Sequence, residues 1–331
     1  MTEERKCLII IDSNSVIHRA FHALPPLSTK KGEMVNAVYG FLLVFFKAIK
    51  EFHPENIVAA FDLPFPTFRH KKFKEYKAKR PKAPKELYEQ IPKVKEVLKA
   101  FNVPILEKEG FEADDIIGTI SNKFSQDQKG SKRDVVILSG DSDVLQLVNK
   151  NTKALILRRG VKDTVLYDEK LVKEKYQGLN PDQLDEFKAL RGDPSDNIPG
   201  VKGIGEKTAI HLIKRFNTLE GLYLNLAGEK DISENIRLKL EQQKDQAFLS
   251  KELAQIKRDV PIDVNLDECF WKDYDRQKAA GILEDLEFYS LIPRLPVPGQ
   301  QEDDYCAEKH KKEKKPKEKE EKFKDNLRLW Q

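Results

Sequence analysis

Apolar and polar residues alternate in two different patterns along the first half of the chain. Uninterrupted apolar runs, typical of strands buried on both faces of a parallel sheet, occur at Leu8–Ile11, Ile57–Phe61, Val135–Leu138 and Ala154–Leu157. Helical spacing of apolar residues occurs between them, at Asn36–Glu51, Pro84–Ala100 with a kink at Pro92, and Glu112–Phe124. This alternation predicts an α/β fold with an open, mostly parallel sheet.

The second half of the chain has a different organisation. From Asn180 to Arg258 the spacing predicts helices only, interrupted by a Gly- and Pro-rich turn at Gly192–Gly205. Residues 259–295 are expected to return and pack on the α/β body. After Pro296 the apolar pattern stops and basic and acidic residues intermingle, which predicts a disordered charged tail at 296–331.

Composition and charge exclude several classes of protein. The 331 residues are 39% hydrophobic and 34% charged, yet the formal net charge is only +4, which excludes a histone-like basic protein and an acidic disordered one. Cys7, Cys269 and Cys306 are too far apart for a zinc ribbon or a disulfide framework, which fits a reducing compartment. The longest apolar stretch, Ala37–Phe46, is shorter than the ~20 residues of a bilayer span, and the N-terminus has no secretory signal. We therefore expect a cytoplasmic protein without membrane contacts.

Acidic residues follow three of the predicted strands. Asp12 ends the first, Asp62 follows the second, and Asp141 and Asp143 follow Val135–Leu138. Further acids begin the helix after Gly110 or lie in the Gly- and Pro-rich turn: Glu112, Asp114, Asp115, Asp193 and Asp196. Because ligands of open α/β sheets bind beyond the carboxyl ends of the strands, we expect these side chains to converge. Converging carboxylates repel one another unless cations neutralise them.

Each acid taken alone has a simpler explanation, because Asp is common at helix N-termini and in turns. The coincidence of five acidic groups at strand ends and helix starts favours a metal site instead. Carboxylate oxygens suit Mg²⁺ or Mn²⁺ rather than zinc. Several carboxylates around two such ions are a known arrangement for phosphodiester hydrolysis.

The segment Arg69–Lys82 is strongly basic, with Glu75 as its single acid, and aromatic residues such as Phe73 and Tyr76 lie between the charges. Cations follow a phosphate backbone and aromatic rings stack on bases, so the pattern favours a contact with single-stranded nucleic acid. A solvated surface helix is the alternative and would be preferred if the segment stood alone. Beside an acidic metal site, nucleic acid becomes the better interpretation.

A glycine-rich turn at Pro199–Ala209 gives a second indication of nucleic acid. Gly203 and Gly205 permit a tight turn, and the free amides of the following helix, together with Lys202 and Lys207, can hold a phosphate. A cofactor phosphate loop is the alternative, but no predicted strand precedes the turn. A helix-hairpin-helix that grips duplex DNA without reading its sequence fits better.

Taken together, these stretches resemble the 5′-nuclease domain of bacterial DNA polymerase I and, more broadly, the flap endonuclease and 5′-3′ exonuclease superfamily. The resemblance spans roughly residues 7–290 in family order, through Ile11-Asp12, Phe61-Asp62 with Pro66–His70, Tyr76–Arg80, Glu112–Asp115, Gly140–Asp143 and Arg191–Ala209. It implies a PIN-like nuclease core with a helical arch, plus an all-helical helix-hairpin-helix domain. The corresponding ranges are 1–177 for the core, with the arch at about 64–90, and 178–295 for the hairpin domain and C-terminal packing helices.

The resemblance also implies a role for each site residue. Asp12, Asp62, Glu112 and Asp114 would surround one metal ion, and Asp141, Asp143, Asp193 and Asp196 would serve a second, with Asp115 completing the ring. Lys77 and Arg80 would steady the scissile phosphate, and Tyr76 would stack on a base. Arg69, Lys202, Gly203, Gly205 and Lys207 would contact DNA, with K⁺ as a further ion at the hairpin.

We therefore expect a divalent-metal-dependent 5′-3′ exonuclease and 5′-flap endonuclease of DNA replication and repair. Its expected substrates are 5′-flap, branched or nicked duplex DNA, and it is expected to act as a monomer. Two alternatives stay open: a non-catalytic module that binds branched DNA, against which the intact acidic set argues, and a strand-end phosphatase. The latter would place a second Asp at position 14, where Asn14 stands.

The tail ends in a short apolar pattern that its charged surroundings do not explain. Leu327, Leu329 and Trp330 follow a long polar run and resemble the sliding-clamp-binding peptide of bacterial replication proteins. Such side chains fill apolar grooves on a partner. A frayed end that packs back on the body is the alternative.

Overall fold

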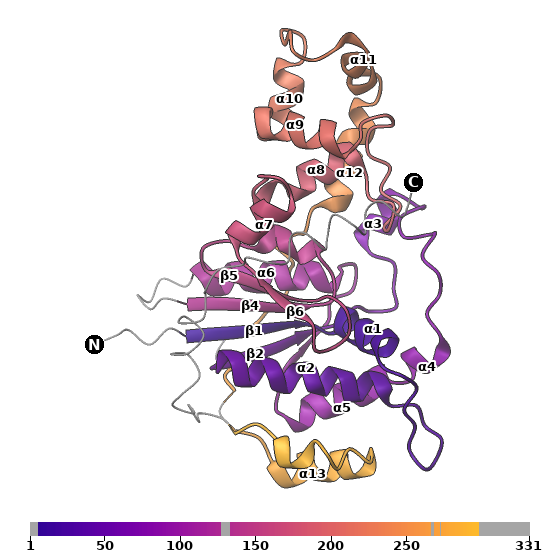
Figure 1. Cartoon of the computed structure of the whole chain (residues 1–331), viewed down its shortest axis with the longest axis vertical. Helices are drawn as coiled ribbons and strands as arrows, with labels where there is room; N and C mark the ends of the chain where they lie inside the picture. The colour runs from indigo at the N-terminus through magenta and orange to yellow at the C-terminus, as the bar shows by residue number, and fades with distance from the viewer. Residues whose placement is uncertain (1–5, 127–132, 266–267, 272, 298–331) are drawn as a thin grey trace, which may run out of the picture. The chain divides into compact units, whose positions relative to one another are not determined.

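A six-stranded sheet is the central element of the computed structural model, which describes residues 6–126, 133–265, 268–271 and 273–297 (Figure 1). Its strand order is β3-β2-β1-β4-β5-β6, and every neighbouring pair is parallel except β5 and β6. The strands are β1 Lys6–Asp12, β2 Asn56–Ala60, β3 Ile105–Leu106, β4 Arg133–Ser139, β5 Thr152–Leu157 and β6 Thr164–Tyr167. The predicted α/β class and all four predicted strands are confirmed.

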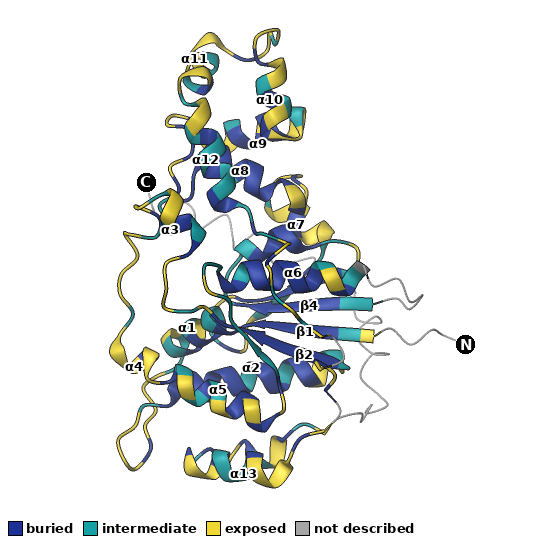
Figure 2. Cartoon of the chain, turned by 180° about the vertical axis from the view of Figure 1, so that it is seen from behind, coloured by how far each residue is buried: buried dark blue, intermediate teal, exposed yellow. Residues whose placement is uncertain are grey.

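Helices cover both faces of this sheet (Figure 1). One face packs under α1, α2 and α5, with α13 packed outside them against α5, and the other face packs under α6 and continues into the helical region. The bounds of these helices are α1 Ser13–Ala23, α2 Asn36–Phe52, α5 Ile91–Ala100, α6 Ala113–Gln126 and α13 Arg276–Asp285. A 3₁₀ turn, η1 Asp143–Leu147, follows β4, and helix α7 Glu169–Lys175 follows β6. The central strands are buried along almost their whole length, as their uninterrupted apolar sequences require (Figure 2).

The predicted helix at Pro84–Ala100 and the predicted helical arch are both wrong in detail. Two short helices, α3 Phe68–Lys72 and α4 Lys85–Tyr88, flank a stretch of turns, and α5 begins separately at Ile91. Pro92 lies in the first turn of α5, where its missing N–H costs no helical hydrogen bond, so it starts a helix instead of kinking one. The buried Gln90 side chain fixes this break, because its Oε1 accepts the Ala37 amide at 2.7 Å.

Beyond α7 the described chain is helical as far as Ala254, as predicted. The elements are η2 Pro181–Gln183, α8 Leu184–Arg191, α9 Glu206–Phe216, α10 Leu219–Asn225, α11 Glu234–Gln242 and α12 Lys244–Ala254. Helices α8 and α9 flank the Gly- and Pro-rich turn, which gives the expected helix-hairpin-helix. Gly200 has a φ of +62°, and a Cβ there would stand 2.2 Å from the Gly192 amide nitrogen, so only glycine fits this turn.

The chain then returns to the sheet, as predicted for residues 259–295. The Ile57 amide donates to the Cys269 carbonyl at 2.9 Å, and the Trp271 indole donates to the Phe101 carbonyl at 2.9 Å. Helix α13 and the 3₁₀ turn η3 Ile292–Arg294 follow. No helix among the described residues has the length and apolar character needed to cross a membrane. Residues 298–331, with the tail residues Leu327, Leu329 and Trp330, lie outside the described part of the chain.

Candidate metal and nucleic-acid site

Acidic side chains from three neighbouring strands lie at the carboxyl edge of the sheet. The register of β1 pairs Asp12 with Ala60 of β2 and Ile11 with Leu138 of β4, so Asp12, Asp62 and Asp141 follow the same sheet edge. Asp62 Oδ1 accepts the Ala113 amide at 2.8 Å and so joins this edge to the start of α6. These three acids therefore lie along one edge of the sheet, as their positions at the strand ends predict.

Two serine hydroxyls orient Asp12 between β1 and the turn after β4. Ser139, which is 0% exposed, donates its proton to Asp12 Oδ2 at 2.6 Å. Ser139 Oγ also accepts the Asp141 amide at 2.9 Å, and Ser15 Oγ accepts the Gly140 amide at 2.8 Å. The Ser15 hydroxyl donates to the Asp12 carbonyl at 3.1 Å and lies 3.0 Å from Ser139 Oγ, so it links the end of β1 to the turn after β4.

The pKa values of these acids are shifted in different directions. Burial raises the pKa of Asp12 to about 6, with Asp62 and Asp141 adding to the rise against the hydrogen bonds from Ser139 and Ser15. Burial and then the charges of Asp12 and Asp141 raise the pKa of Asp114. At both residues burial is the larger cause, because it disfavours the charged carboxylate, and the neighbouring acids add to it.

Other acids already have a cation beside them. Burial opposes ionisation of Glu112, but Lys77 and Arg69 outweigh it and hold its pKa at about 2. Lys77 Nζ lies 2.7 Å from Glu112 Oε2, and Arg80 pairs with Asp196. Lys188 of α8 bridges Asp143 and Asp193 at 2.5 and 2.7 Å, and it lowers the pKa of Asp193 to about 2 against the effect of burial. At Asp143 burial outweighs the same lysine and raises the pKa to about 6.

The middle of the predicted arch is fastened to the turn that carries Asp196. The Lys77 amide donates to the Asp196 carbonyl at 2.9 Å, and Asn197 Nδ2 donates to the Glu75 carbonyl at 2.7 Å. Lys77 has a φ of +55°, a left-handed conformation that costs a non-glycine residue about 1–2 kcal/mol. Its contacts with Asp196 and Glu112 hold that conformation in place.

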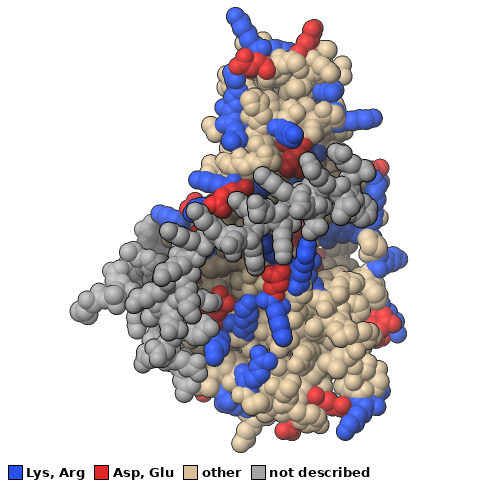
Figure 3. All heavy atoms as spheres, in the orientation of Figure 1, with Lys and Arg blue, Asp and Glu red and all other residues tan. Residues whose placement is uncertain are grey.

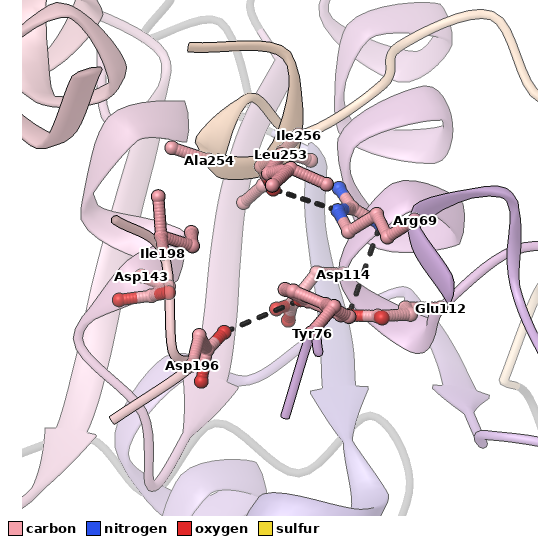
Figure 4. A pocket seen from close by; sticks show the side chains of 10 residues that line it. All are labelled: Arg69, Tyr76, Glu112, Asp114, Asp143, Asp196, Ile198, Leu253, Ala254 and Ile256. Atoms are coloured by element: carbon pink, nitrogen blue, oxygen red, sulfur yellow. Dashed lines mark hydrogen bonds and ion pairs between the residues drawn. The ribbon is translucent and has the colours of Figure 1, made fainter. Parts of the chain in front are cut away.

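Tyr76 lies between Asp196 and Glu112, and Arg69 lies beside Glu112 (Figure 4). The remaining cavity, between Tyr76, Glu112, Asp114, Asp143 and Asp196, is about 10 Å³, room for about one water molecule. Among the described residues, no three acidic, histidine or cysteine side chains stand close enough to hold one metal ion. The oxygen-only donor set and the raised pKa values of Asp12 and Asp114 nevertheless fit a hard divalent cation, provided that the lysine and arginine side chains move aside.

Three of the predicted site residues have surroundings that differ from their expected roles. Both carboxylate oxygens of Asp115 accept hydrogen bonds from Arg69, and Asp115 is 0% exposed, so it is not among the acids that face the cavity. Arg69 itself is 2% exposed, which leaves no surface for DNA. Tyr76 is 3% exposed, and its hydroxyl points at Glu112 and Asp196, each at 3.2 Å, so its ring is not available for a base. Phe65, at the start of the predicted arch, is 54% exposed, so a base could reach its ring.

The hairpin residues lie where the sequence predicts them. Lys202, Gly203, Gly205 and Lys207 are all exposed, on the turn that enters α9. The Lys202 amide donates to Gln243 Oε1 at 2.8 Å, which fixes the turn and leaves the ammonium group in solvent. Figure 3 shows further Lys and Arg side chains along the helical region and on the body.

Sequence reasoning did not single out Lys188, Ser15 or Ser139. Lys188 lies among the helical residues before the turn, and nothing in its spacing distinguishes it from a solvated lysine. The two serines had a usable signal, since both are next to strand ends that carry candidate ligands. A hydroxyl at such a position can orient a ligand.

The fold and the site together define a nuclease-like α/β core with an appended helix-hairpin-helix domain. Residues 7–177 match the family model "5′-3′ exonuclease, N-terminal resolvase-like domain", and residues 179–277 match "5′-3′ exonuclease, C-terminal SAM fold". The chain is 40% identical over 290 residues to the 5′-3′ exonuclease of Aquifex aeolicus, covering 88% of this chain and 95% of that protein. The chain therefore belongs to the 5′-3′ exonuclease family, which confirms the predicted family and enzyme class.

A longer relative matches part of its length, and two solved structures share the fold. The chain is 44% identical over 292 residues to DNA polymerase I of Bacillus subtilis, covering 88% of this chain and 32% of that protein, so it spans about a third of this relative. The flap endonuclease of bacteriophage T5, solved with DNA and metal ions, has a TM-score of 0.62 at 20% identity over 85% of this chain and 100% of that one. The catalytic core of Rad2, in complex with DNA substrate, has a TM-score of 0.53 at 18% identity over 88% and 93%. These two structures share the fold.

Proposed function

We propose that this chain is a structure-specific 5′ nuclease that hydrolyses DNA phosphodiester bonds with two divalent ions. The observation that supports it best is the group of acids that follow the carboxyl edge of the sheet, with the arch cation Lys77 paired to Glu112. An exposed glycine-rich hairpin on the adjoining helical region supplies a surface for duplex DNA.

The residues present divide into two sets that would hold the ions, Mg²⁺ or Mn²⁺. Asp12, Asp62, Glu112 and Asp114 would hold one, and Asp141, Asp143, Asp193 and Asp196 the other. Bound ions would supply Lewis-acid polarisation of the phosphate and a water of lowered pKa. Asp115 is left out of this proposal because both of its oxygens are already occupied.

The chain's own groups would bind and orient the substrate. Lys77 and Arg80, which now neutralise Glu112 and Asp196, would exchange these carboxylates for the oxygens of the scissile phosphate. Tyr76 would stay a positioning residue, because its hydroxyl already contacts both of those acids. Lys202 and Lys207 would hold the duplex backbone, with K⁺ at the Gly203–Gly205 turn as a further proposed ion.

The experiment is a cleavage assay on a labelled 5′-flap duplex and on nicked duplex DNA, with Mg²⁺ or with EDTA, using the purified chain. Cutting near the junction only with Mg²⁺ is the expected result. Tight binding of the flap without cutting in Mg²⁺ or Mn²⁺ would instead support the non-catalytic branched-DNA module. Sedimentation of the same sample checks the proposed monomer.

A sliding clamp is the proposed partner of the tail. The basis is the sequence alone, in which Leu327, Leu329 and Trp330 form a short apolar end to a charged stretch. A peptide of residues 322–331 is expected to bind the host's clamp, and a peptide with Leu329→Ala and Trp330→Ala is not. Equal binding by the two peptides, or none by either, would contradict the proposal.

A further inference from the structure

A buried ion pair joins three parts of the chain beside the candidate metal site. The guanidinium of Arg69, in α3, donates to Asp115, in α6, from Nη1 to Oδ2 at 2.7 Å and from Nη2 to Oδ1 at 2.8 Å. Its remaining donors reach the end of α12. Nε donates to the Leu253 carbonyl at 2.9 Å, and Nη2 donates to the Gln255 carbonyl at 2.8 Å.

Asp115 has no free oxygen in this arrangement. Besides the two bonds from Arg69, Oδ1 accepts the Lys257 amide at 2.9 Å, and Oδ2 accepts the Glu112 amide at 3.1 Å. Each oxygen therefore has two donors, which satisfies a buried carboxylate without a metal ion. Asp115 thereby connects the backbone of Glu112 to the segment that follows α12. Glu112 is one of the acids that line the cavity.

The guanidinium also bears on the side chain of Glu112. Arg69 Nη1 lies 3.7 Å from Glu112 Oε2, the oxygen that Lys77 and Tyr76 also contact. The Arg69 guanidinium, which α3 carries, therefore contacts the start of α6 and the C-terminal end of α12 (Figure 4). A bidentate fork of this kind sets geometry more tightly than a single charge can.

We infer that Arg69 and Asp115 act as one positioning pair that aligns Glu112 with the hairpin domain, and that neither binds DNA or metal directly. The duplex grip on the hairpin and the acids at the sheet edge are then held in a fixed relation through the contacts at Leu253, Gln255 and Lys257. The catalytic readout of this inference rests on the proposed nuclease function. The structural test of the inference, which locates bound ions relative to Asp115, does not depend on that function.

Two single variants, Arg69→Lys and Asp115→Asn, distinguish a joint role from separate ones. A joint role gives both variants the same phenotype: the single-turnover cleavage rate falls about 10–100-fold, as for other residues that orient ligands. The Kd for flap DNA in EDTA stays within about twofold of wild type, because Arg69 offers no surface to DNA. The double variant is no slower than the slower single one, since the two residues act as a unit.

Separate roles give a different result. If Asp115 is a ligand and Arg69 a DNA contact, Asp115→Asn raises only the Mg²⁺ concentration for half-maximal rate, and Arg69→Lys raises only the Kd for DNA. That split would overturn the inference. The control is Glu252→Gln, which removes the exposed ion pair of Glu252 with Lys72 across the same α3–α12 contact. It should cleave and bind as wild type does, because exposed pairs contribute little.

A measurement on the wild-type protein keeps the inference testable if the variants do not fold or if no cleavage is found. Crystals soaked in Mn²⁺ locate the ions by their anomalous scattering. The expected result is that no ion lies within about 2.5 Å of either Asp115 oxygen and that the bidentate pair with Arg69 persists. An ion bound to Asp115 would overturn the inference, whereas absence of cleavage by wild type with Asp115 paired as described would overturn only the nuclease proposal.

Discussion

At the scale of single residues, the acids of the site differ in what neutralises them. Glu112 and Asp193 each have a lysine Nζ at 2.7 Å and a pKa of about 2. Asp12 has no ion pair among the described residues, and burial raises its pKa to about 6. Asp12 is thus a buried carboxyl group without a cation beside it in the described part of the chain, and a perturbed pKa of this kind is typical of functional sites.

Asp141→Ala tests the ligand assignment directly. Removing one carboxylate should abolish flap cleavage, because the second ion loses an oxygen ligand on the strand edge. DNA binding in EDTA should survive or improve, because a negative charge near the phosphates is removed. Single-turnover cleavage and fluorescence anisotropy measure the two effects. Wild-type turnover in this variant would show that Asp141 is not a ligand.

Ser139→Ala tests the hydroxyl that orients Asp12. The variant loses the donor to Asp12 Oδ2 and the acceptor of the Asp141 amide, and we expect cleavage to slow about 10–100-fold. Stability should fall by about 1 kcal/mol, because the partly buried Asp141 amide loses its acceptor. The matched control is Ser121→Ala, which deletes another buried hydroxyl, one that donates at 3.3 Å to the Gly118 carbonyl within α6. Equal rates in the two variants would exclude the orienting role.

At the scale of elements, the sequence predicts strands better than the arch. The apolar runs of β1, β2, β4 and β5 are typical of strands that are buried on both faces inside a sheet. The edge strands β3 and β6 are shorter or only partly buried and have no run of four apolar residues. A surface helix is the alternative for the basic segment, but beyond Lys72 its backbone forms turns that bond to the Asp196 loop, a contact between residues far apart in the sequence.

The same limit applies to the site. Strand ends identify Asp12, Asp62 and Asp141, because the carboxyl edge of a parallel sheet is set by topology alone. Partners such as Lys188 for Asp143, 45 residues apart, or Arg69 for Asp115, 46 residues apart, depend on tertiary packing that no local spacing records. Both pairs were therefore missed, and Asp115 and Arg69 received roles that their burial does not support.

The arch and the hairpin should fail in different ways when a lysine is removed. Lys77→Ala is expected to slow single-turnover cleavage strongly with little change in Kd, because Lys77 lies at the acids. Lys202→Ala should weaken duplex binding and reduce the slope of log K against log salt by about one, since it removes one phosphate contact. Titrations at several salt concentrations and saturating single-turnover assays distinguish the two. An exchange of the two phenotypes would overturn this division of roles.

At the scale of the whole molecule, the proposed ligands come from segments that are far apart in the chain. Asp12, Asp62 and Asp141 follow β1, β2 and β4, Glu112 precedes α6, and Asp193 follows α8. Only the folded chain brings these groups together, so divalent ions should bind the folded state and not the unfolded one. Ion binding is then linked to the stability of the nuclease core and the hairpin region at once.

Mg²⁺ is therefore expected to raise the melting temperature of the protein in the absence of DNA. At a free concentration 100 times its Kd, an ion stabilises the folded state by about 2.7 kcal/mol, which corresponds to a rise of about 5 °C for a domain of this size. The gain is reduced by whatever it costs to move Lys77 and Lys188 away from the acids that they now neutralise. Melting followed by circular dichroism, in MgCl₂ and in EDTA at matched ionic strength, measures the shift, with Asp141→Ala as the control that should show a smaller one. An equal shift in both proteins would mean that Mg²⁺ acts elsewhere, and no shift in wild type would mean that the folded chain alone does not bind the ions.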